Sequence, residues 1–272
     1  MRIIDLTEKY LSKFINEGDR DGYERSCPDL FYNYYRFWAK RELNITIVDY
    51  EEIQKRKKWV TRLIEKLKII LNENNIDDSA IDFIYFIGAG TTNGHAFRSK
   101  DKWLVWLPLE TYSSEKLVEV FVTHELIHAL HYNNSPSFYF NSKNEMLQIS
   151  RQLITEGLAT YLTREFLGIS NLEALWADYL SDDDALRWWE KCIAEERNLY
   201  RLISQYYYKS DHKLEIFYAS NPDNIYQFRS GYFAGLRLVE RYAMENGLSA
   251  EDILELIRAR FEKDIANLLQ PD

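Results

Sequence analysis

The sequence is poor in the residues that make turns. It has ten glycines and five prolines in 272 residues, which is about half of the usual ~12% share. Because β-sandwiches and barrels need many tight turns, this scarcity argues against them and favours long helices. With 46% hydrophobic and 15% aromatic residues, the chain can bury a sizeable core, which excludes disorder of the chain as a whole.

Cysteine and positive charge are also scarce. Two cysteines, Cys27 and Cys192, are too few for a disulfide framework or a cysteine-based zinc site, so we expect two buried thiols. Lys and Arg number 34 against 43 Asp and Glu, a net charge of −9, which argues against nucleic acid as a partner and favours basic or neutral substrates. The basic run at residues 55–58 is expected to be a solvated helix face.

Long hydrophobic runs are missing as well. No segment reaches the ~18 uncharged apolar residues of a membrane span, and the first residues contain no apolar run of signal-peptide length. We therefore expect a cytoplasmic protein without a membrane partner.

Hydrophobic periodicity divides the chain into helices and a few strands. Helical spacing predicts three helices, at residues 6–15, 28–43 and 50–71. Two β-rich apolar runs, at residues 81–87 and 103–107, predict strands. The second strand ends at Pro108, which is typical of a sheet edge. An edge strand can pair with an extended peptide, and core packing of its apolar side chains is the alternative.

From Ser114 the pattern is helical nearly to the end of the chain. Ser170, Ser181 and Ser249 are each followed three residues later by an acid, as in capping boxes, and Gly168 and Gly247 are expected to end helices. No repeat, low-complexity tract or linker is visible. We therefore predict a helix-rich α+β fold, with a helical N-terminal elaboration at residues 1–75 and one further domain at residues 76–272.

The segment that carries chemistry is His124-Glu125-Leu126-Ile127-His128, an HExxH arrangement in a strongly apolar run. On a helix the two histidines lie about 40° apart and one turn apart, so both imidazoles can reach one zinc ion. Glu125 is turned about 100° toward the place of a metal-bound water. The alternative is a pair of hydrogen-bonded core histidines with a salt-bridged glutamate, since such groups are costly to bury unpaired.

A catalytic zinc site needs a third ligand and one open position. His131 shares the histidine face but lies about 10 Å along the helix axis from His124, which is too far, so we expect it beside the site or exposed. Glu156 is the better candidate, on an apolar stripe of a helix expected at residues 145–166 and next to the small residue Gly157. A partly buried acid paired with an arginine is the alternative for Glu156.

The remaining candidates have no supporting pattern. Glu165 lies on the opposite side of the same expected helix from Glu156 and should face solvent. Neither His95 nor His212 is singled out, and neither cysteine has a local partner.

Together these motifs resemble a known group. His124-Glu125-x-x-His128, followed 28 residues later by Glu156-Gly157-Leu158-Ala159, resembles the gluzincin arrangement, in which the third zinc ligand is a glutamate on a later helix. More narrowly, the sequence is similar to an uncharacterised bacterial family of predicted zinc-dependent proteases, whose members add a Gly-Tyr-x-x-Gly helix. Gly231-Tyr232-Phe233-Ala234-Gly235 matches that element, and the resemblance covers roughly residues 80–260.

The resemblance implies a zincin-like metallopeptidase fold. His124, His128 and Glu156 would hold Zn2+, and Glu125 would act as the general base in hydrolysis of a peptide bond. Tyr232 and Tyr161 are then candidates for stabilising the oxyanion. The implied partner is a peptide or protein substrate. Thr160 stands where family members often have an aspartate that orients a histidine.

Two other functions fit the same residues. One is a zinc-stabilised binding or regulatory module with a peptidase-like fold and no turnover. The other is metal-assisted hydrolysis of a non-peptide amide or ester. No pattern specifies the cleavage preference, the choice between endopeptidase and exopeptidase action, or the oligomeric state.

Residues 88–94, here called the glycine-rich loop, follow a predicted strand. The loop departs from the GxGxxG nucleotide-binding pattern because its third glycine is one place late, and a strand rather than a helix follows it. We therefore expect a flexible loop, with His95 at the surface.

Overall fold

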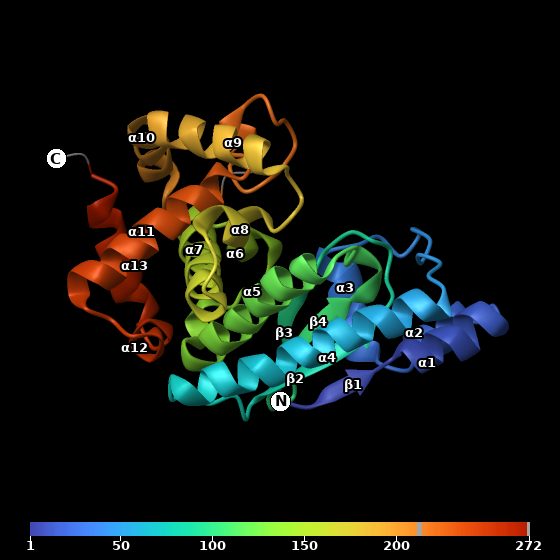
Figure 1. Ribbon diagram of the computed structural model, residues 1–272. Helices are drawn as coiled ribbons and strands as arrows, with labels where there is room; N and C mark the ends of the chain where they lie inside the picture. The colour runs from blue at the N-terminus through green and yellow to red at the C-terminus, as the bar shows by residue number, and fades with distance from the viewer. Residues whose placement is uncertain (211–213, 271–272) are drawn as a thin grey trace. The chain divides into compact units, whose positions relative to one another are not determined.

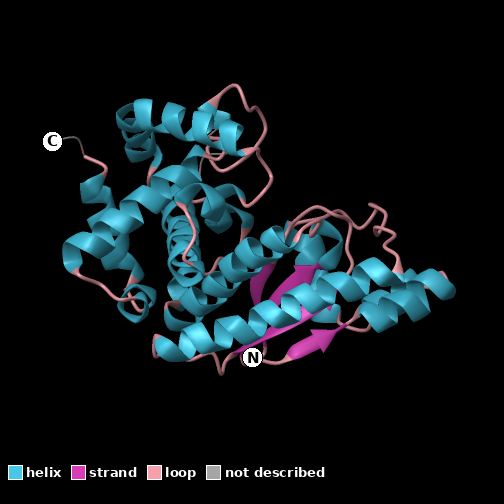
Figure 2. Cartoon of the chain, in the orientation of Figure 1, coloured by secondary structure: helices cyan, strands magenta, loops and turns pink. Residues whose placement is uncertain are grey.

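The computed structural model describes residues 1–210 and 214–270. Its many helices and one four-stranded sheet within these ranges (Figure 2) confirm the predicted helix-rich α+β class. The chain divides into two compact units, Met1–Leu130 and His131–Asp272. The predicted boundary near residue 75 stays a prediction.

The first unit contains the sheet and the N-terminal helices (Figure 1, blue to green). In chain order its elements are β1 (Ile3–Asp5), α1 (Thr7–Lys9), the π-helix η1 (Tyr10–Asn16), α2 (Arg20–Glu24), α3 (Pro28–Phe37), α4 (Tyr50–Glu73), β2 (Ile81–Phe86), β3 (His95–Ser99), β4 (Lys102–Pro108), the 3-10 helix η2 (Leu109–Thr111) and the start of α5 (Glu115–Asn134).

The sheet has the strand order β1-β2-β4-β3. Both predicted strands are confirmed as β2 and β4, which pair in parallel with Ile81 opposite Trp103. Nearly every residue of these two strands is buried, as parallel strands covered on both faces require. The edge prediction for the second strand is wrong, because β3 pairs antiparallel with β4 and takes the edge position itself. Pro108 merely ends β4, where its missing N–H costs little.

The predicted N-terminal helices hold in part. The one expected at residues 50–71 is confirmed as α4, which Asp49 caps by accepting from the N–H of Glu52 at 2.8 Å. The one expected at residues 28–43 ends earlier, at Phe37. The one expected at residues 6–15 is confirmed as the continuous helical stretch of α1 and η1, whose second part is a π-helix. The three-residue strand β1, which pairs with β2, is too short to show a pattern in the sequence.

The second unit is helical (Figure 1, yellow-green to red). It holds the end of α5, followed by the 3-10 helix η3 (Pro136–Phe138), α6 (Lys143–Met146), α7 (Ile149–Leu167), α8 (Asn171–Trp176), α9 (Asp182–Ala194), α10 (Glu196–Tyr206), the 3-10 helix η4 (Ile225–Gln227), α11 (Ser230–Asn246), α12 (Ala250–Leu254) and α13 (Arg258–Leu268).

The predicted helix ends in this unit are confirmed at single-residue level. Ser170 and Ser249 form full capping boxes, and the Ser181 side chain accepts from the N–H of Asp184. Gly168 and Gly247 end α7 and α11 in the left-handed conformation. The helix expected at residues 145–166 is interrupted after α6, so α7 begins at Ile149.

The packing of α7 against α11 depends on two glycines. A Cβ atom on Gly157 would overlap the backbone of Gly235, and one on Gly235 would overlap the backbone carbonyl of Leu153. The two helices can therefore approach backbone to backbone only because both positions lack a side chain. Since Gly157 follows Glu156 directly, this contact also sets the position of Glu156 within the second unit.

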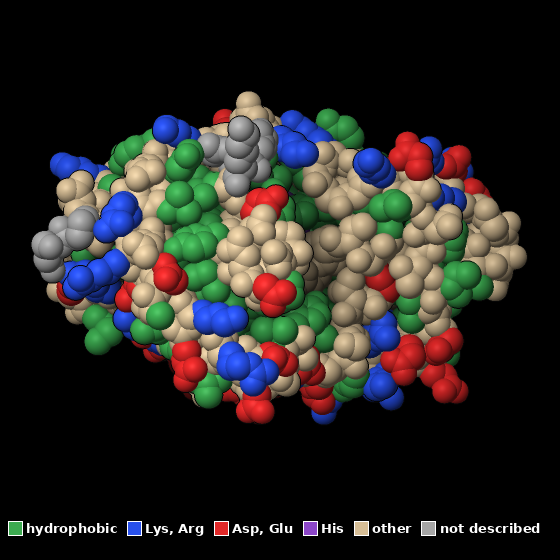
Figure 3. Space-filling model, turned by 90° about the horizontal axis from the view of Figure 1, so that it is seen from above, with side chains coloured by type: hydrophobic (Ala, Val, Ile, Leu, Met, Phe, Trp, Pro, Cys, Tyr) green, Lys and Arg blue, Asp and Glu red, His purple; other side chains and the backbone are tan. Residues whose placement is uncertain are grey.

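None of the helices in the described ranges combines the length and apolar character needed to span a bilayer. On the face shown in Figure 3, acidic and basic side chains are interspersed.

Candidate metal centre

Helix α5 carries the HExxH residues in an almost fully buried setting. From Val120 to Tyr132 every residue is buried except Glu125, which is half-buried. The two histidines are 6% and 5% exposed. The polar residues of the motif thus lie in an apolar environment, and only the glutamate between them retains some access to solvent.

The two imidazoles face one another. The Nε2 atoms of His124 and His128 lie 3.1 Å apart, and the ring centroids are 4.7 Å apart at 83°. Two nitrogens bound to zinc at 2.0–2.1 Å with tetrahedral angles would lie about 3.3 Å apart. The pair is therefore preformed for chelation, although one N–H···N hydrogen bond would give a similar distance.

The third donor is what distinguishes a metal site from a histidine pair. One ligand atom from each of His124, His128 and Glu156 lies within 4.8 Å of the other two. Two imidazoles and one carboxylate are the donors of a catalytic zinc site with three protein ligands. The donors and spacing of this group could therefore hold a metal ion of this kind.

The other candidates are not part of that group. His131 is fully buried, with its ring 4.4 Å from that of Phe138, which excludes the exposed position. His95 is buried in β3 against Trp38, so its predicted surface position is wrong. It faces inward because it opens the edge strand on the side of the aromatic core.

The cysteines and Glu165 show no link to a metal site either. Both cysteines are free, and only Cys192 is fully buried, whereas Cys27 is half-buried. Glu165 is exposed beside Arg164, as predicted. His212 lies outside the described residues.

Glu125 fits against a glycine in the first unit. A Cβ atom on Gly94 would come within 2.6 Å of Cγ of Glu125, and Gly94 has a φ of +156°, which side-chain-bearing residues rarely adopt. The position therefore admits only glycine while Glu125 keeps its place. The sequence shows this glycine but not its neighbour, because the two residues are 31 positions apart.

The glycine-rich loop that ends at Gly94 is held in place rather than flexible, which corrects the sequence-based expectation. The Tyr34 hydroxyl accepts from the N–H of Ala89 at 2.8 Å and lies 3.0 Å from the Thr91 hydroxyl. The Tyr112 hydroxyl donates to the carbonyl of Asn93. Polar side chains from distant elements thus form hydrogen bonds with backbone groups of the loop. No local sequence pattern predicts these hydrogen bonds.

Glu110 is a second support of the same loop. Its Oε1 atom accepts from the N–H of Gly90 at 3.1 Å, while its enclosed Oε2 atom has no hydrogen-bond partner among the described residues. Burial raises the pKa of Glu110 to about 7, although backbone N–H groups of the loop and the charge of Arg56 oppose the rise. The carboxyl that supports the loop therefore titrates near neutrality.

The two tyrosine candidates occupy different settings in the second unit. Tyr161 lies under the guanidinium of Arg164, at 5.1 Å, and burial raises the pKa of its phenol. Tyr232 lies on α11, one turn before Gly235, and so close to the contact with Gly157. Its ring packs against Phe217 at 5.9 Å.

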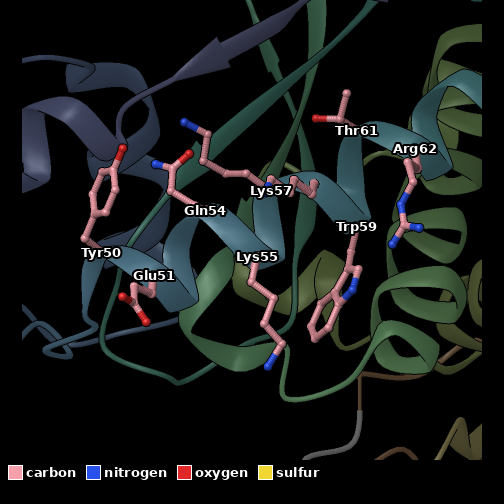
Figure 4. Close-up of a pocket in the computed structure, with 9 residues that line it drawn as sticks. Tyr50, Glu51, Gln54, Lys55, Lys57, Trp59, Thr61 and Arg62 are labelled. Atoms are coloured by element: carbon pink, nitrogen blue, oxygen red, sulfur yellow. The ribbon is translucent and has the colours of Figure 1, made fainter.

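A separate hollow of about 850 Å³ follows the outer face of α4 (Figure 4). Lys55 and Lys57 extend from opposite sides of the helix, and both are engaged in ion pairs, Lys55 with Glu52 at 3.2 Å and Lys57 with Asp5. Lys55 and Lys58 of the basic run are exposed, whereas Arg56 and Lys57 are half-buried, so the predicted solvated helix face is confirmed only in part.

Comparison with known protein families agrees with this geometry. A family model described as predicted Zn-dependent protease (DUF2268) matches residues 57–262, and the chain belongs to this family. Neither the curated proteins nor the solved structures that were compared match the chain.

Proposed function

We propose that this member of the predicted zinc-dependent protease family is a zinc metallopeptidase with a zincin-like fold. The observation that carries the proposal is the convergence of ligand atoms from His124, His128 and Glu156 within 4.8 Å. The half-buried Glu125, next to the first histidine, supplies the acid–base group that hydrolysis needs.

The division of work follows from the donor set. His124, His128 and Glu156 would hold the ion and leave a fourth position open. A zinc ion held there would lower the pKa of a coordinated water to about 7 and polarise a carbonyl oxygen. Glu125 would accept a proton from the attacking water on a carboxylate oxygen and pass it to the leaving nitrogen.

Between the two tyrosines, the packing favours Tyr232 as the oxyanion donor. Tyr161 follows Glu156 by five residues, about 140° around α7, and points away from it. Tyr232 lies one turn from the glycine contact beside Glu156. A protonated phenol at that place would donate to the oxyanion, an interaction whose loss typically costs ~10²–10³ in rate.

The test is metal analysis combined with a peptidase assay. Wild type and Glu125→Gln should both hold about one zinc per chain, while Glu125→Gln loses at least about a hundredfold in turnover. Glu119→Gln, on the same helix, is the matched control and should keep full turnover. Glu156→Gln should lose zinc, whereas Glu165→Gln on the same helix should retain it.

Each outcome discriminates between the functions that fit the sequence. Zinc missing from wild type prepared without chelators contradicts the proposal. Bound zinc whose chelation lowers the thermal midpoint, without cleavage of any member of a diverse peptide library, supports the binding or regulatory module instead.

A further inference from the structure

Arg229 lies in an unusual setting at the start of α11. Its backbone is left-handed, with φ 56° and ψ 18°, although it carries a long side chain. Ala177, directly after Trp176, also has a positive φ of 50°. Two of the four non-glycine residues with positive φ in the described ranges, Arg229 and Ala177, thus lie next to Trp176. Backbone strain of this kind concentrates at functional sites.

Two aromatic rings hold the guanidinium of Arg229. Its central carbon lies 4.9 Å from the ring of Trp176 and 4.3 Å from the ring of Tyr232. Stacking on aromatic faces leaves the edge of a guanidinium, which carries the N–H donors, open to a further partner. The side chain is half-buried, so that partner can arrive from solvent.

The described residues provide no anion for this cation. Arg229 forms no ion pair with any carboxylate in the described ranges, including Asp178, two positions after Trp176. Two enclosed donors next to it in the chain or in space, Trp176 Nε1 and Ser230 Oγ, also have no hydrogen-bond partner there. By contrast, Trp188 Nε1 donates to the carbonyl of Phe228 at 2.7 Å.

The donors on the open edge of the Arg229 guanidinium call for a ligand that only accepts. A carboxylate has two acceptor oxygens and no donor, and it pairs with the planar fork of a guanidinium through two hydrogen bonds. An amide or hydroxyl would leave the positive charge of Arg229 without a partner.

The location connects this cation to the candidate metal centre. Arg229 precedes Gly235 by six residues, about 9 Å along α11, and Gly235 contacts Gly157, the neighbour of Glu156. An extended peptide advances about 3.3–3.6 Å per residue. A carboxylate one to three residues from the scissile bond would therefore come within reach of Arg229.

We propose that Arg229 is a specificity-determining residue that binds a substrate carboxylate close to the scissile bond, either an acidic side chain or the C-terminal carboxylate. This inference rests on the proposed peptidase function. The net charge of the chain favours basic or neutral substrates. Arg229 would add to this a single contact at the site that selects for an anion.

The test uses binding, so that it does not depend on turnover. Three pools of random nonapeptides are titrated into the zinc-loaded Glu125→Gln chain and followed by fluorescence anisotropy. One pool has a central Glu and capped ends, one a central Gln and capped ends, and one a central Gln and a free C-terminus. We expect either the Glu pool or the free-C-terminus pool to bind about tenfold more tightly than the capped Gln pool.

Further variants identify the residue responsible. Adding Arg229→Gln should abolish the preference, and Arg229→Lys should restore part of it, because an ammonium keeps the charge but not the fork. Arg237→Gln, a half-exposed cation on the same helix that pairs with Glu196, is the control and should leave the preference unchanged.

Equal binding of all three pools to the Glu125→Gln chain overturns the proposal. A preference that is kept in Arg229→Gln also overturns the proposal. If that variant keeps the preference and only melts at a lower temperature, Arg229 has a structural role in joining α8 to α11. Failure of the peptidase function shows separately, as missing zinc or missing cleavage in the wild-type assay.

Discussion

The neighbours of Glu125 and Glu156 are held in place by different means. In the first unit Glu125 fits against Gly94 at the end of a loop that is held by polar side chains, among them Glu110. In the second unit Glu156 is positioned by the backbone contact between Gly157 and Gly235, with no hydrogen bond in that contact. The loop beside Glu125 is thus held by a titratable network, and the helix contact beside Glu156 by steric fit.

This contrast predicts different sensitivities. A network of hydrogen bonds that includes a carboxyl responds to pH and tolerates substitutions that keep its acceptors. A contact between two backbones does not respond to pH, but it cannot accommodate even one added methyl group.

The largest effect is expected at the helix contact. Gly235→Ala places a Cβ atom against the carbonyl of Leu153, which cannot move without shifting α7, so the free energy of unfolding should fall by about 3–4 kcal/mol. Gly168→Ala is the control, because that position has positive φ but nothing within 4 Å and should cost about 1 kcal/mol. Urea denaturation measures both, and equal losses would contradict the steric explanation.

A pH-dependent effect is expected at Glu110. Between pH 4.5 and about 7 the folded chain keeps a proton that the unfolded chain has already lost, so the free energy of unfolding falls as pH rises through this window. The full fall amounts to about 3 kcal/mol. Glu110→Gln should match wild type at pH 4 and be more stable at pH 8, as measured by urea denaturation. Glu65→Gln, at an exposed position, should differ from wild type at neither pH.

The smallest effect is expected at the end of the glycine-rich loop. Gly94→Ala should displace Glu125 and lower kcat by about tenfold to a hundredfold, at 1.36 kcal/mol per tenfold, while the zinc content stays unchanged. Gly90→Ala shares the cost of positive φ, but its nearest neighbour, the Thr46 hydroxyl, would lie 3.7 Å away. If both variants lose turnover equally, loop strain rather than contact with Glu125 is the cause.

Local patterns predicted the parts of the fold that depend on neighbouring residues. The two apolar strands, α4 and the serine caps were predictable because each depends on residues within a few positions of one another. The strand β3 and the edge of the sheet were not predictable, because a short strand is defined by its pairing with a neighbouring strand. The supports of the glycine-rich loop were not predictable either, because Tyr34, Glu110 and Tyr112 are distant from it in the sequence.

The sequence by itself determined the chemistry of the candidate centre, because helical spacing brings His124 and His128 onto one face whatever surrounds them. It also singled out Glu156, because a carboxylate on an apolar stripe of a helix needs a positively charged partner. Only the tertiary structure decided that Gly94 lies against Glu125, that Glu110 is buried enough to titrate near neutrality, and that Arg229 has no anion among the described residues. Contacts between distant residues depend on how helices and strands pack, and such packing produces no repeating pattern in a single sequence.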